Sequence, residues 1–397
     1  MALAAITILN GCSLWSDNDP ATKSSLERVK YYHGALMDDL DLESLERAAI
    51  ESVKYFEKTD STAKFMFGDR AVSARELSLS VQELVRIFRE ESDAKKRARI
   101  IRRKFDFYKG RGAYEDGNVL ITGYYQPTLN GSRSPDDVYK WPIYKKPGDM
   151  VEIDLGEFSK ELKNKKYFGR VEGERVVPYY DRRAIDRDDA LSGRGLEIAW
   201  VDDRVELFFL HVQGSGIVRL SDGSEIFVNY AAQNGRKYRS IGRRLIDNGE
   251  ISREKMSLGA IRDYLDKHPG LLGPTLYHNP SYVFFREMDD GPFGSIGAKL
   301  VGGRSAAFDR VYFPRGGLAY VTTEAPVVEQ GKAVGWKKVQ RFVFSHDAGG
   351  AIKGPSRMDL YFGSGRDASA GAGRMKQSGE ILFLALKEKV MAKMSAR

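Results

Sequence analysis

The chain has few of the residues that build covalent or metal-bound frameworks. Among its 397 residues are one cysteine, Cys12, and five histidines. A single cysteine excludes an intrachain disulfide. No Cys-x-x-Cys or His-Glu-x-x-His motif is present, and the histidines are not spaced as metal ligands. A phosphate-binding Walker loop and a dinucleotide fingerprint are also missing. The sequence therefore predicts a protein with no metal and no cofactor.

Long hydrophobic runs are scarce. The segment Met1–Gly11 has no charged side chain, but it is far shorter than the roughly 20 apolar residues of a membrane-spanning helix. It is typical of a signal h-region, although the usual basic n-region is absent. It ends in Leu9–Cys12, which resembles a bacterial lipobox. We therefore expect 1–24 to be a lipoprotein signal and tether, with Cys12 lipidated and first in the mature protein. The alternative is an incidental cysteine near a frayed terminus.

Acidic residues are fewer than basic ones. The chain has 63 Lys and Arg against 55 Asp and Glu, a net charge of +8 and a pI near 9.2. A basic surface attracts anionic partners but does not choose among nucleic acid, lipid and cell-wall polymer. No aromatic-interleaved basic motif and no helix-turn-helix signature is present, so a nucleic-acid partner is not expected. A solvated basic surface is the simpler interpretation.

Glycine and aromatic residues are plentiful, and they favour a β-rich fold with many turns. Forty glycines accompany 20 Phe, 20 Tyr and 4 Trp. The length favours two domains. Apolar periodicity predicts helices in the first hundred residues, where Ser73 opens a plausible capping box. Short alternating runs after Gly112 predict strands. The predicted helices are Ser25–Lys58, as two short helices or one with a bend near Asp41, Ser73–Lys104, Ile241–Asp247 and Leu258–Lys267. The predicted strands include Val119–Thr122, Val205–Phe209, Phe342–Phe344 and one starting at Gly379.

The segment Ser345–Met375 is the most informative part of the chain. It holds three aspartates, Asp347, Asp359 and Asp367, among seven glycines and no other acid. We expect no helix here, because each interior glycine costs about 1 kcal/mol against alanine. The run Met358–Phe362 alternates as a strand does, which places Asp359 opposite its apolar neighbours. This pattern indicates a carboxylate on a strand aimed into a cleft, while the other two aspartates are expected to hold turns.

Seven blocks in order resemble the membrane-bound lytic murein transglycosylase A (MltA) family, over roughly residues 118 to 386. One is the three-aspartate segment itself. The other six are Gly123–Pro127, Pro178–Arg182, Glu197–Asp203, Phe208–Gly216, Asn234–Gly242 and Asn279–Phe285. Two segments, Val301–Asp309 and Tyr312–Gly317, depart from the family pattern, which leaves the geometry of those loops open.

The resemblance implies the fold and its divisions. The expected fold is mostly β with N-terminal helices. A double-psi β-barrel carries the three aspartates, a second β-barrel is inserted into it, and a groove lies between them. The implied divisions are 25–130 for the helices and first barrel strands, 131–275 for the insert, and 276–397 for the rest of the double-psi barrel and a frayed tail. Grooves between domains commonly hold ligands.

The resemblance also implies the chemistry. Asp359 matches the family's catalytic aspartate, and we expect Asp347 and Asp367 to support it. Lys353 should point elsewhere or bind substrate, because a close ammonium would lower the pKa of the acid. The expected enzyme is a peptidoglycan lytic exotransglycosylase that leaves 1,6-anhydro-MurNAc ends, although the residues themselves leave endo and exo action open. One acid suffices because the MurNAc C6 hydroxyl is a built-in nucleophile. Expected partners are glycan strands and, through Cys12, a periplasmic membrane, with cell-wall synthesis or division proteins as further candidates. Ser13 favours the outer membrane. Expected substrate-binding residues are Tyr124, Tyr125, Gln126, Gln213, Gly214 and Ser215.

Two other functions fit the same residues. One is a polysaccharide-binding lipoprotein without catalysis, in which the tyrosines are barrel core. The other is a hydrolase with two carboxylates, in which Asp347 or Asp367 joins Asp359. The Gln213–Gly216 segment is not a nucleophile elbow, because that motif requires Gly-x-Ser-x-Gly.

Overall fold

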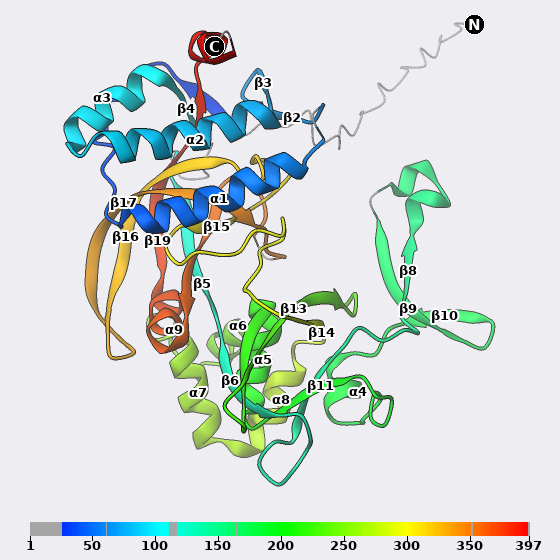
Figure 1. Cartoon of the computed structure of the whole chain (residues 1–397). Helices are drawn as coiled ribbons and strands as arrows, with labels where there is room; N and C mark the ends of the chain where they lie inside the picture. The colour runs from blue at the N-terminus through cyan, green and yellow to red at the C-terminus, as the bar shows by residue number, and fades with distance from the viewer. Residues whose placement is uncertain (1–25, 61, 111–116, 164, 351, 396–397) are drawn as a thin grey trace, which may run out of the picture.

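A closed β-barrel is the larger of the two main β-structures in the computed structural model, which describes residues 26–60, 62–110, 117–163, 165–350 and 352–395 (Figure 1). Its strands pair in the order β19-β16-β17-β15-β18-β5, and β5 pairs back with β19 to close it. Two further strands, β1 and β4, extend the sheet beyond β19. The bounds are β1 Leu26–Val29, β4 Phe105–Gly110, β5 Val119–Gln126, β15 Ser305–Phe308, β16 Leu318–Glu329, β17 Lys332–Asp347, β18 Arg357–Ser364 and β19 Lys376–Leu386.

A second sheet of six strands is built mainly from the middle of the chain. The order is β14-β13-β12-β6-β11-β7, and an isolated bridge from Lys145 to Phe285 connects its two edges. Strand β6 begins just before the 131–275 range expected for the insert and β14 lies after it, whereas the other four strands lie within that range. The bounds are β6 Thr128–Ser132, β7 Trp141–Tyr144, β11 Glu197–Val201, β12 Ser215–Leu220, β13 Glu225–Gln233 and β14 Val283–Met288.

Two small sheets and two 3-10 turns complete the β-rich parts. A three-stranded sheet projects to the right in Figure 1, and a hairpin lies near the N-terminal helices. The bounds are β2 Lys64–Phe67, β3 Arg70–Ser73, β8 Val151–Asp154, η1 Leu155–Glu157, η2 Lys160–Leu162, β9 Lys166–Glu172 and β10 Arg175–Pro178.

Helices α1 to α3 cover one side of the barrel, whereas α4 to α8 accompany the second sheet (Figure 1). One apolar core joins the first group to the barrel strands. No described helix is long and apolar enough to cross a bilayer. The bounds are α1 Leu42–Lys58, α2 Ala74–Glu90, α3 Ala94–Lys104, α4 Arg182–Asp186, α5 Arg204–Gln213, α6 Ile241–Asp247, α7 Leu258–Lys267, α8 Pro269–Tyr277, α9 Gly365–Arg374 and α10 Glu388–Ser395.

The predicted fold class is confirmed, and so are several elements. The capping box at Ser73 is present: its hydroxyl accepts from the Glu76 amide, and the Glu76 carboxylate accepts from the Ser73 amide. The helix predicted over Ser73–Lys104 is divided in two, because Asp93 caps a new helix by accepting from the Lys96 amide.

Four predictions at the level of single elements were wrong. The start of the predicted helix Ser25–Lys58 is strand β1, whose backbone pairs with β4, and the helix begins only after Asp41, its N-cap. The run Val205–Phe209 is helix α5: Asp203 caps it, and burial of almost all its apolar residues imitates a strand pattern. Helix α9 occupies the glycine-rich segment, and helix α10 ends the described chain in place of a frayed tail.

Close packing explains why α9 forms despite its glycines. A Cβ on Gly371 would lie 2.7 Å from a ring carbon of Phe362, so the missing side chain lets the helix approach strand β18. Ala368 and Ala372 on the same helix are buried against Tyr125. The favourable free energy of this packing offsets the poor helix propensity of glycine.

Candidate active site

A row of side chains across four neighbouring barrel strands forms the candidate site. Asp359 on β18 pairs with Thr122 on β5 and with Ala307 on β15, and Ala307 pairs with Asp347 on β17. Paired residues of neighbouring strands point to the same face of a sheet. Two of the three aspartates therefore share one face, separated by the small side chain of Ala307.

Strand β18 aims Asp359 away from the core, as the alternation predicted. Met358 and Leu360 are buried in the barrel core, whereas Asp359 and Tyr361 belong to the other face. Tyr361 pairs with Tyr124 on β5, and their rings lie 5.1 Å apart. The chain passes from β5 into β6 of the second sheet just after these residues, so the site lies beside the junction of the two β-structures.

The Asp359 carboxyl has an environment that keeps it protonated to a higher pH than an ordinary aspartate. Burial raises its pKa to about 6, and the nearby negative charge of Asp347 acts in the same direction. A hydrogen bond from the Thr122 hydroxyl, 2.6 Å long, and the positive charge of Arg357 oppose that rise in pKa. Desolvation of the charged form outweighs both, as is typical of a buried carboxyl.

Asp347 is held by the backbone. Its Oδ1 accepts from the amides of Ser295 and Ala348, each at 2.8 Å. Burial raises the pKa of this carboxyl as well, although these hydrogen bonds work against the shift. The charges of Asp347 and Asp359 add to burial in raising the pKa of Tyr124 well above its ordinary value.

Asp367 is apart from this row. It is exposed in the first turn of α9, where its Oδ1 accepts from the backbone amide of Gly331 at 2.6 Å. Gly331 has a φ of +75° in the turn between β16 and β17. The carboxylate therefore connects α9 to that hairpin turn.

We expect Asp367→Asn to weaken this connection and leave the chemical step intact. An amide oxygen accepts less strongly than a carboxylate, and a hydrogen bond to a charged group contributes about 1.5–3 kcal/mol, less where water competes. The melting temperature should fall slightly while kcat on murein sacculi stays within about twofold of wild type. A variant with unchanged melting temperature and no turnover would contradict this and favour a second catalytic carboxylate.

The other residues predicted for the site are divided between the two β-structures. Tyr125 and Gln126 are buried, 5% and 1% exposed, which favours packing over direct contact with a ligand. The Gln213 side chain accepts from the Tyr125 amide at 3.3 Å and so connects α5 to β5. Gly214 ends α5 with a φ of +81°, and Ser215 begins β12. Lys353 is exposed, and Arg357 is the cation whose charge affects the pKa of Asp359.

Thr122, Arg357 and Ser295 are site residues that the sequence did not indicate. Thr122 had a usable signal, since it ends the predicted strand Val119–Thr122 and lies two positions before Tyr124, on the same face if the strand continues. Ser295 had none, because its contact with Asp347 spans 52 residues. Cys12 lies outside the described residues.

The sequence blocks of the middle segment meet in a buried network at the second sheet. The Arg182 guanidinium donates to the carbonyls of Asn279 at 3.2 Å and Ser281 at 2.8 Å, and it lies 3.0 Å from Nδ1 of His211. Asn234 donates to the carbonyls of Tyr180 and Pro280, each at 2.9 Å. These blocks therefore stabilise the insert and are not part of the aspartate row.

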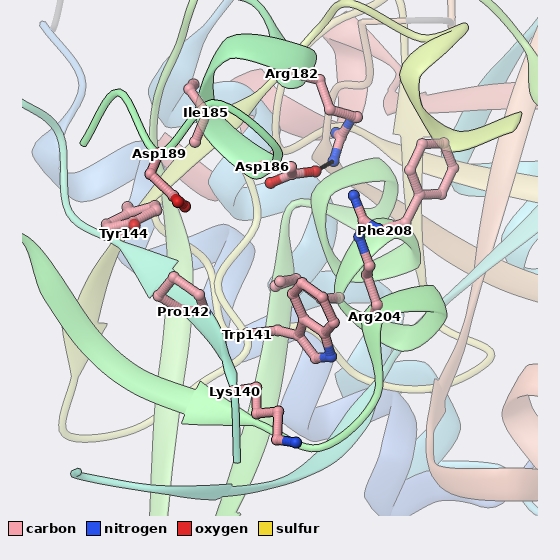
Figure 2. Close-up of a pocket in the computed structure, with 11 residues that line it drawn as sticks. Lys140, Trp141, Pro142, Tyr144, Arg182, Ile185, Asp186, Asp189, Arg204 and Phe208 are labelled. Carbon is pink, nitrogen blue, oxygen red and sulfur yellow. Dashed lines mark ion pairs between the residues drawn. The ribbon is translucent and has the colours of Figure 1, made fainter. Parts of the chain in front are cut away.

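A pocket beside this network contains none of the predicted site residues (Figure 2). It lies between β7, α4 and α5. Arg182 forms an ion pair with Asp186 at 3.5 Å, and the Arg204 guanidinium lies over the Trp141 ring at 4.8 Å. The side chains of Arg182, Asp186 and Arg204 in this pocket therefore already interact with other groups of the protein. Within the described ranges, no three His, Cys, Asp or Glu side chains gather as a metal site.

Comparison with known proteins agrees with this arrangement. Residues 120–286 match the MltA specific insert domain and residues 304–385 match the 3D domain. A curated relative in Vibrio cholerae, membrane-bound lytic murein transglycosylase A, is 34% identical over 278 residues, 69% of this chain and 67% of that protein. The protein of the same name in Escherichia coli K12 is 32% identical over 282 residues, 70% and 69% of the two chains.

Solved structures are similar over most of the chain. A membrane-bound lytic murein transglycosylase from Agrobacterium tumefaciens has a TM-score of 0.74 at 31% identity, covering 93% of this chain and 99% of that one. Escherichia coli MltA with bound chitohexaose has a TM-score of 0.68 at 27% identity, covering 91% and 95%. The fold and the aspartate row define a two-part β-protein with a 3D domain. The chain belongs to the membrane-bound lytic murein transglycosylase A family.

Proposed function

We propose that this protein is a lytic transglycosylase that cleaves the β-1,4 bond between MurNAc and GlcNAc in peptidoglycan. The observation that carries the proposal is the Asp359 carboxyl, desolvated on a barrel strand with a pKa of about 6. A group with this pKa can both give and accept a proton near neutral pH. The relatives named lytic murein transglycosylase A, and the one bound to chitohexaose, support a glycan substrate.

The mechanism needs one carboxyl group. Protonated Asp359 gives its proton to the glycosidic oxygen as the bond from that oxygen to C1 of MurNAc breaks. The C6 hydroxyl oxygen then bonds to C1, and its proton returns to the Asp359 carboxylate. The products are a GlcNAc end with a free hydroxyl and a 1,6-anhydro-MurNAc end, and no water is consumed. A hydroxyl held close to the reacting carbon replaces a second carboxylate, with an effective molarity of roughly 10⁵ M or more.

The other residues have supporting roles in this proposal. Thr122 orients the Asp359 carboxyl, and Asp347 adds negative charge that keeps the proton on it at higher pH. Tyr124, which is only partly buried, would pack against a sugar next to the acid, and the buried ring of Tyr361 supports it from the neighbouring strand. The glycan would lie across the face of the aspartate row, in a groove between the barrel and the second sheet, with Gln213, Gly214 and Ser215 at its border.

A hydrolase with two carboxylates is the second candidate, because Asp347 and Asp359 share a face two strands apart. That places their Cα atoms roughly 10 Å apart, within the range from which an inverting pair of carboxyl groups could act. Reaction with purified sacculi in ¹⁸O-labelled water separates the two. Transglycosylation gives anhydro ends without label, hydrolysis gives labelled reducing ends, and a binding protein gives neither. Labelled ends as the main product would overturn the proposed function.

The protein would act at a membrane facing the cell wall. Two curated relatives carry the words membrane-bound in their names. In this chain the anchor would be acyl chains on Cys12, after removal of the first eleven residues, and the outer membrane is the proposed location. Each buried CH₂ contributes about 0.8 kcal/mol, so two or three chains together give stable anchoring.

We expect Cys12→Ala to move the protein to the soluble fraction of the cell envelope while its activity on sacculi is kept. Fractionation and immunoblotting measure the first, and release of anhydro-muropeptides measures the second. Mass spectrometry of the native protein with an intact Met1 and an unmodified Cys12 would contradict lipidation. The basic surface would then have to account for any association with the envelope.

A further inference from the structure

The end of strand β17 contains one residue more than its neighbour β15. Ala306 pairs with Ser345, but the next residue, Ala307, pairs with Asp347. The residue between, His346, has no partner on β15, as in a β-bulge. In a regular ladder His346 would face Ala307, and Asp347 would point to the opposite side of the sheet. The bulge is therefore what brings Asp347 into the row that contains Asp359.

Two serines from distant parts of the chain hold the bulged residue. His346 is fully buried, with Nε2 2.9 Å from the Ser52 hydroxyl on α1 and Nδ1 2.9 Å from the Ser305 hydroxyl on β15. Its ring stacks on Phe344 at 5.5 Å with an interplanar angle of 12°. The extra residue is thus fixed at both ring nitrogens and on one face.

The hydrogen-bond directions in this network allow one tautomer. The single hydroxyl proton of Ser52 is donated to the Gly316 carbonyl at 2.9 Å, so Ser52 can only accept from His346. Nε2 therefore carries the proton, and Nδ1 accepts from Ser305, whose oxygen in turn accepts from the Val301 amide at 2.9 Å. A second proton on the ring would reverse the bond to Ser305, and the Ser305 hydroxyl proton would then need another acceptor.

The ring is consequently neutral across the working pH range. Burial lowers the pKa of His346 to about 3, although the negative charge of Glu51 on α1 acts in the opposite direction. Despite its place next to Asp347, His346 cannot act as a general base, since both nitrogens are engaged inside the protein. Its contribution to the site has to be geometric.

We propose that His346, held by Ser52 and Ser305, is a positioning residue that maintains the β17 bulge and thereby keeps the Asp347 carboxylate beside Asp359. This inference rests on the proposed function, in which Asp359 is the acid. The charged groups that act on Asp359 are Asp347 from β17 and Arg357 from β18, and they have opposite effects on its pKa. If Asp347 leaves the row, the effect of Arg357 remains and the pKa of Asp359 falls.

The test compares His346→Phe with wild type and with Asp347→Asn. Phenylalanine keeps the stacked ring and removes both hydrogen bonds. We expect the kcat of His346→Phe on sacculi to fall roughly 10- to 100-fold, which is the range for a small misplacement of a reacting group, while KM changes little. The descending limb of the pH–kcat profile should move to lower pH in both variants. His346→Phe with the kcat and the limb of wild type would overturn the inference.

A matched pair of serine variants separates positioning from a general loss of stability. Ser305→Ala removes the donor to Nδ1, whereas Ser80→Ala removes a buried hydroxyl on α2 that accepts from the Leu386 amide at 3.0 Å, on another strand. Ser305→Ala should move the limb, and Ser80→Ala should not. If His346→Phe does not fold, Ser305→Ala and His346→Asn carry the test by the same criterion. If both serine variants lose kcat equally and the descending limb moves in neither, the role of His346 is purely structural and the inference is overturned.

The same experiment distinguishes failure of the inference from failure of the proposed function. If Asp359→Asn still forms anhydro ends, the proposed function is wrong. If Asp359→Asn is inactive while the His346 and Ser305 variants keep the limb of wild type, only the role of His346 is wrong.

Discussion

Asp359→Asn should abolish formation of anhydro-muropeptides from purified sacculi, with a loss of at least about 10²–10⁴-fold in kcat. The loss should reach the upper end, because the same group serves as acid in one step and base in the other. Asparagine keeps the shape and can still accept from Thr122, so the hydrogen bond at 2.6 Å has a replacement. Turnover by the purified variant near that of wild type would remove the basis of the mechanism.

The stability of Asp359→Asn provides its own control. Burial raises the pKa of Asp359 from 3.8 to about 6 in the folded protein. The contribution of this group to folding is therefore fully present below pH 3.8 and is lost as the pH rises through 6. At pH 7 wild type holds a charged, desolvated carboxylate that the asparagine variant lacks. The melting temperature of the variant at pH 7 should equal or exceed that of wild type, with a smaller advantage near pH 4.

The pH profile of wild type follows from the same pKa. Donation to the glycosidic oxygen requires the protonated acid, so kcat should decrease as the pH rises above about 6. Titration of His346 does not shape the profile near neutral pH, because the ring is already neutral there. A profile that is flat from pH 5 to 8 would contradict the assignment of Asp359 as the acid.

Local pattern was sufficient for the part of the site that lies on one strand. Met358 and Leu360 are apolar and flank an acid, and the structure places those two in the core and Asp359 on the other face. The family resemblance of the sequence blocks, taken in their order, also implied a barrel interrupted by a second β-structure. Both conclusions depend on residues close together in the chain or on a fixed order of motifs.

Features set by distant contacts could not be predicted. The bulge at His346 depends on Ser52, which is 294 residues away, and nothing in the run around Asp347 indicates a change of register. Helix α9 depends on the fit of Gly371 against Phe362, which propensity alone does not describe. Strand β1 depends on pairing with β4, about 80 residues later. In each case tertiary packing overrides the local preference.

Asp38→Asn should lower the free energy of unfolding by about 3–5 kcal/mol, the usual cost of removing one partner of a buried ion pair. The side chains of Asp38 and Arg304 are 1% and 0% exposed, and the two carboxylate oxygens accept from Nη1 at 2.7 Å and Nη2 at 2.8 Å. The same guanidinium donates to the Ser44 hydroxyl and to the carbonyls of Asp41 and Phe342. Asparagine would leave a buried positive charge without its counter-ion.

The neighbouring pair provides a matched control. The side chains of Asp39 and Arg341 are 24% and 8% exposed and form a similar two-pronged pair, with contacts of 2.8 and 2.6 Å. Asp39→Asn should cost less, on the order of 1–2 kcal/mol, because water reaches the carboxylate. Denaturant unfolding of both variants and of wild type measures the difference. Equal losses would show that burial does not set the cost, and a loss below 1 kcal/mol for Asp38→Asn would contradict the prediction outright.

The buried pair also connects stability to the site. Arg304 directly precedes Ser305, the donor to His346. Arg304 also donates to Asp38 and Ser44 at the start of α1, the helix that carries Ser52. Loss of the pair should therefore loosen both anchors of the bulge at once. We expect Asp38→Asn to lose more activity than its loss of folded protein explains, and the descending limb of its pH–kcat profile to move to lower pH. Asp39→Asn should keep the limb of wild type. Activity that follows the folded fraction alone would show that the pair supports the barrel without acting on the row of aspartates.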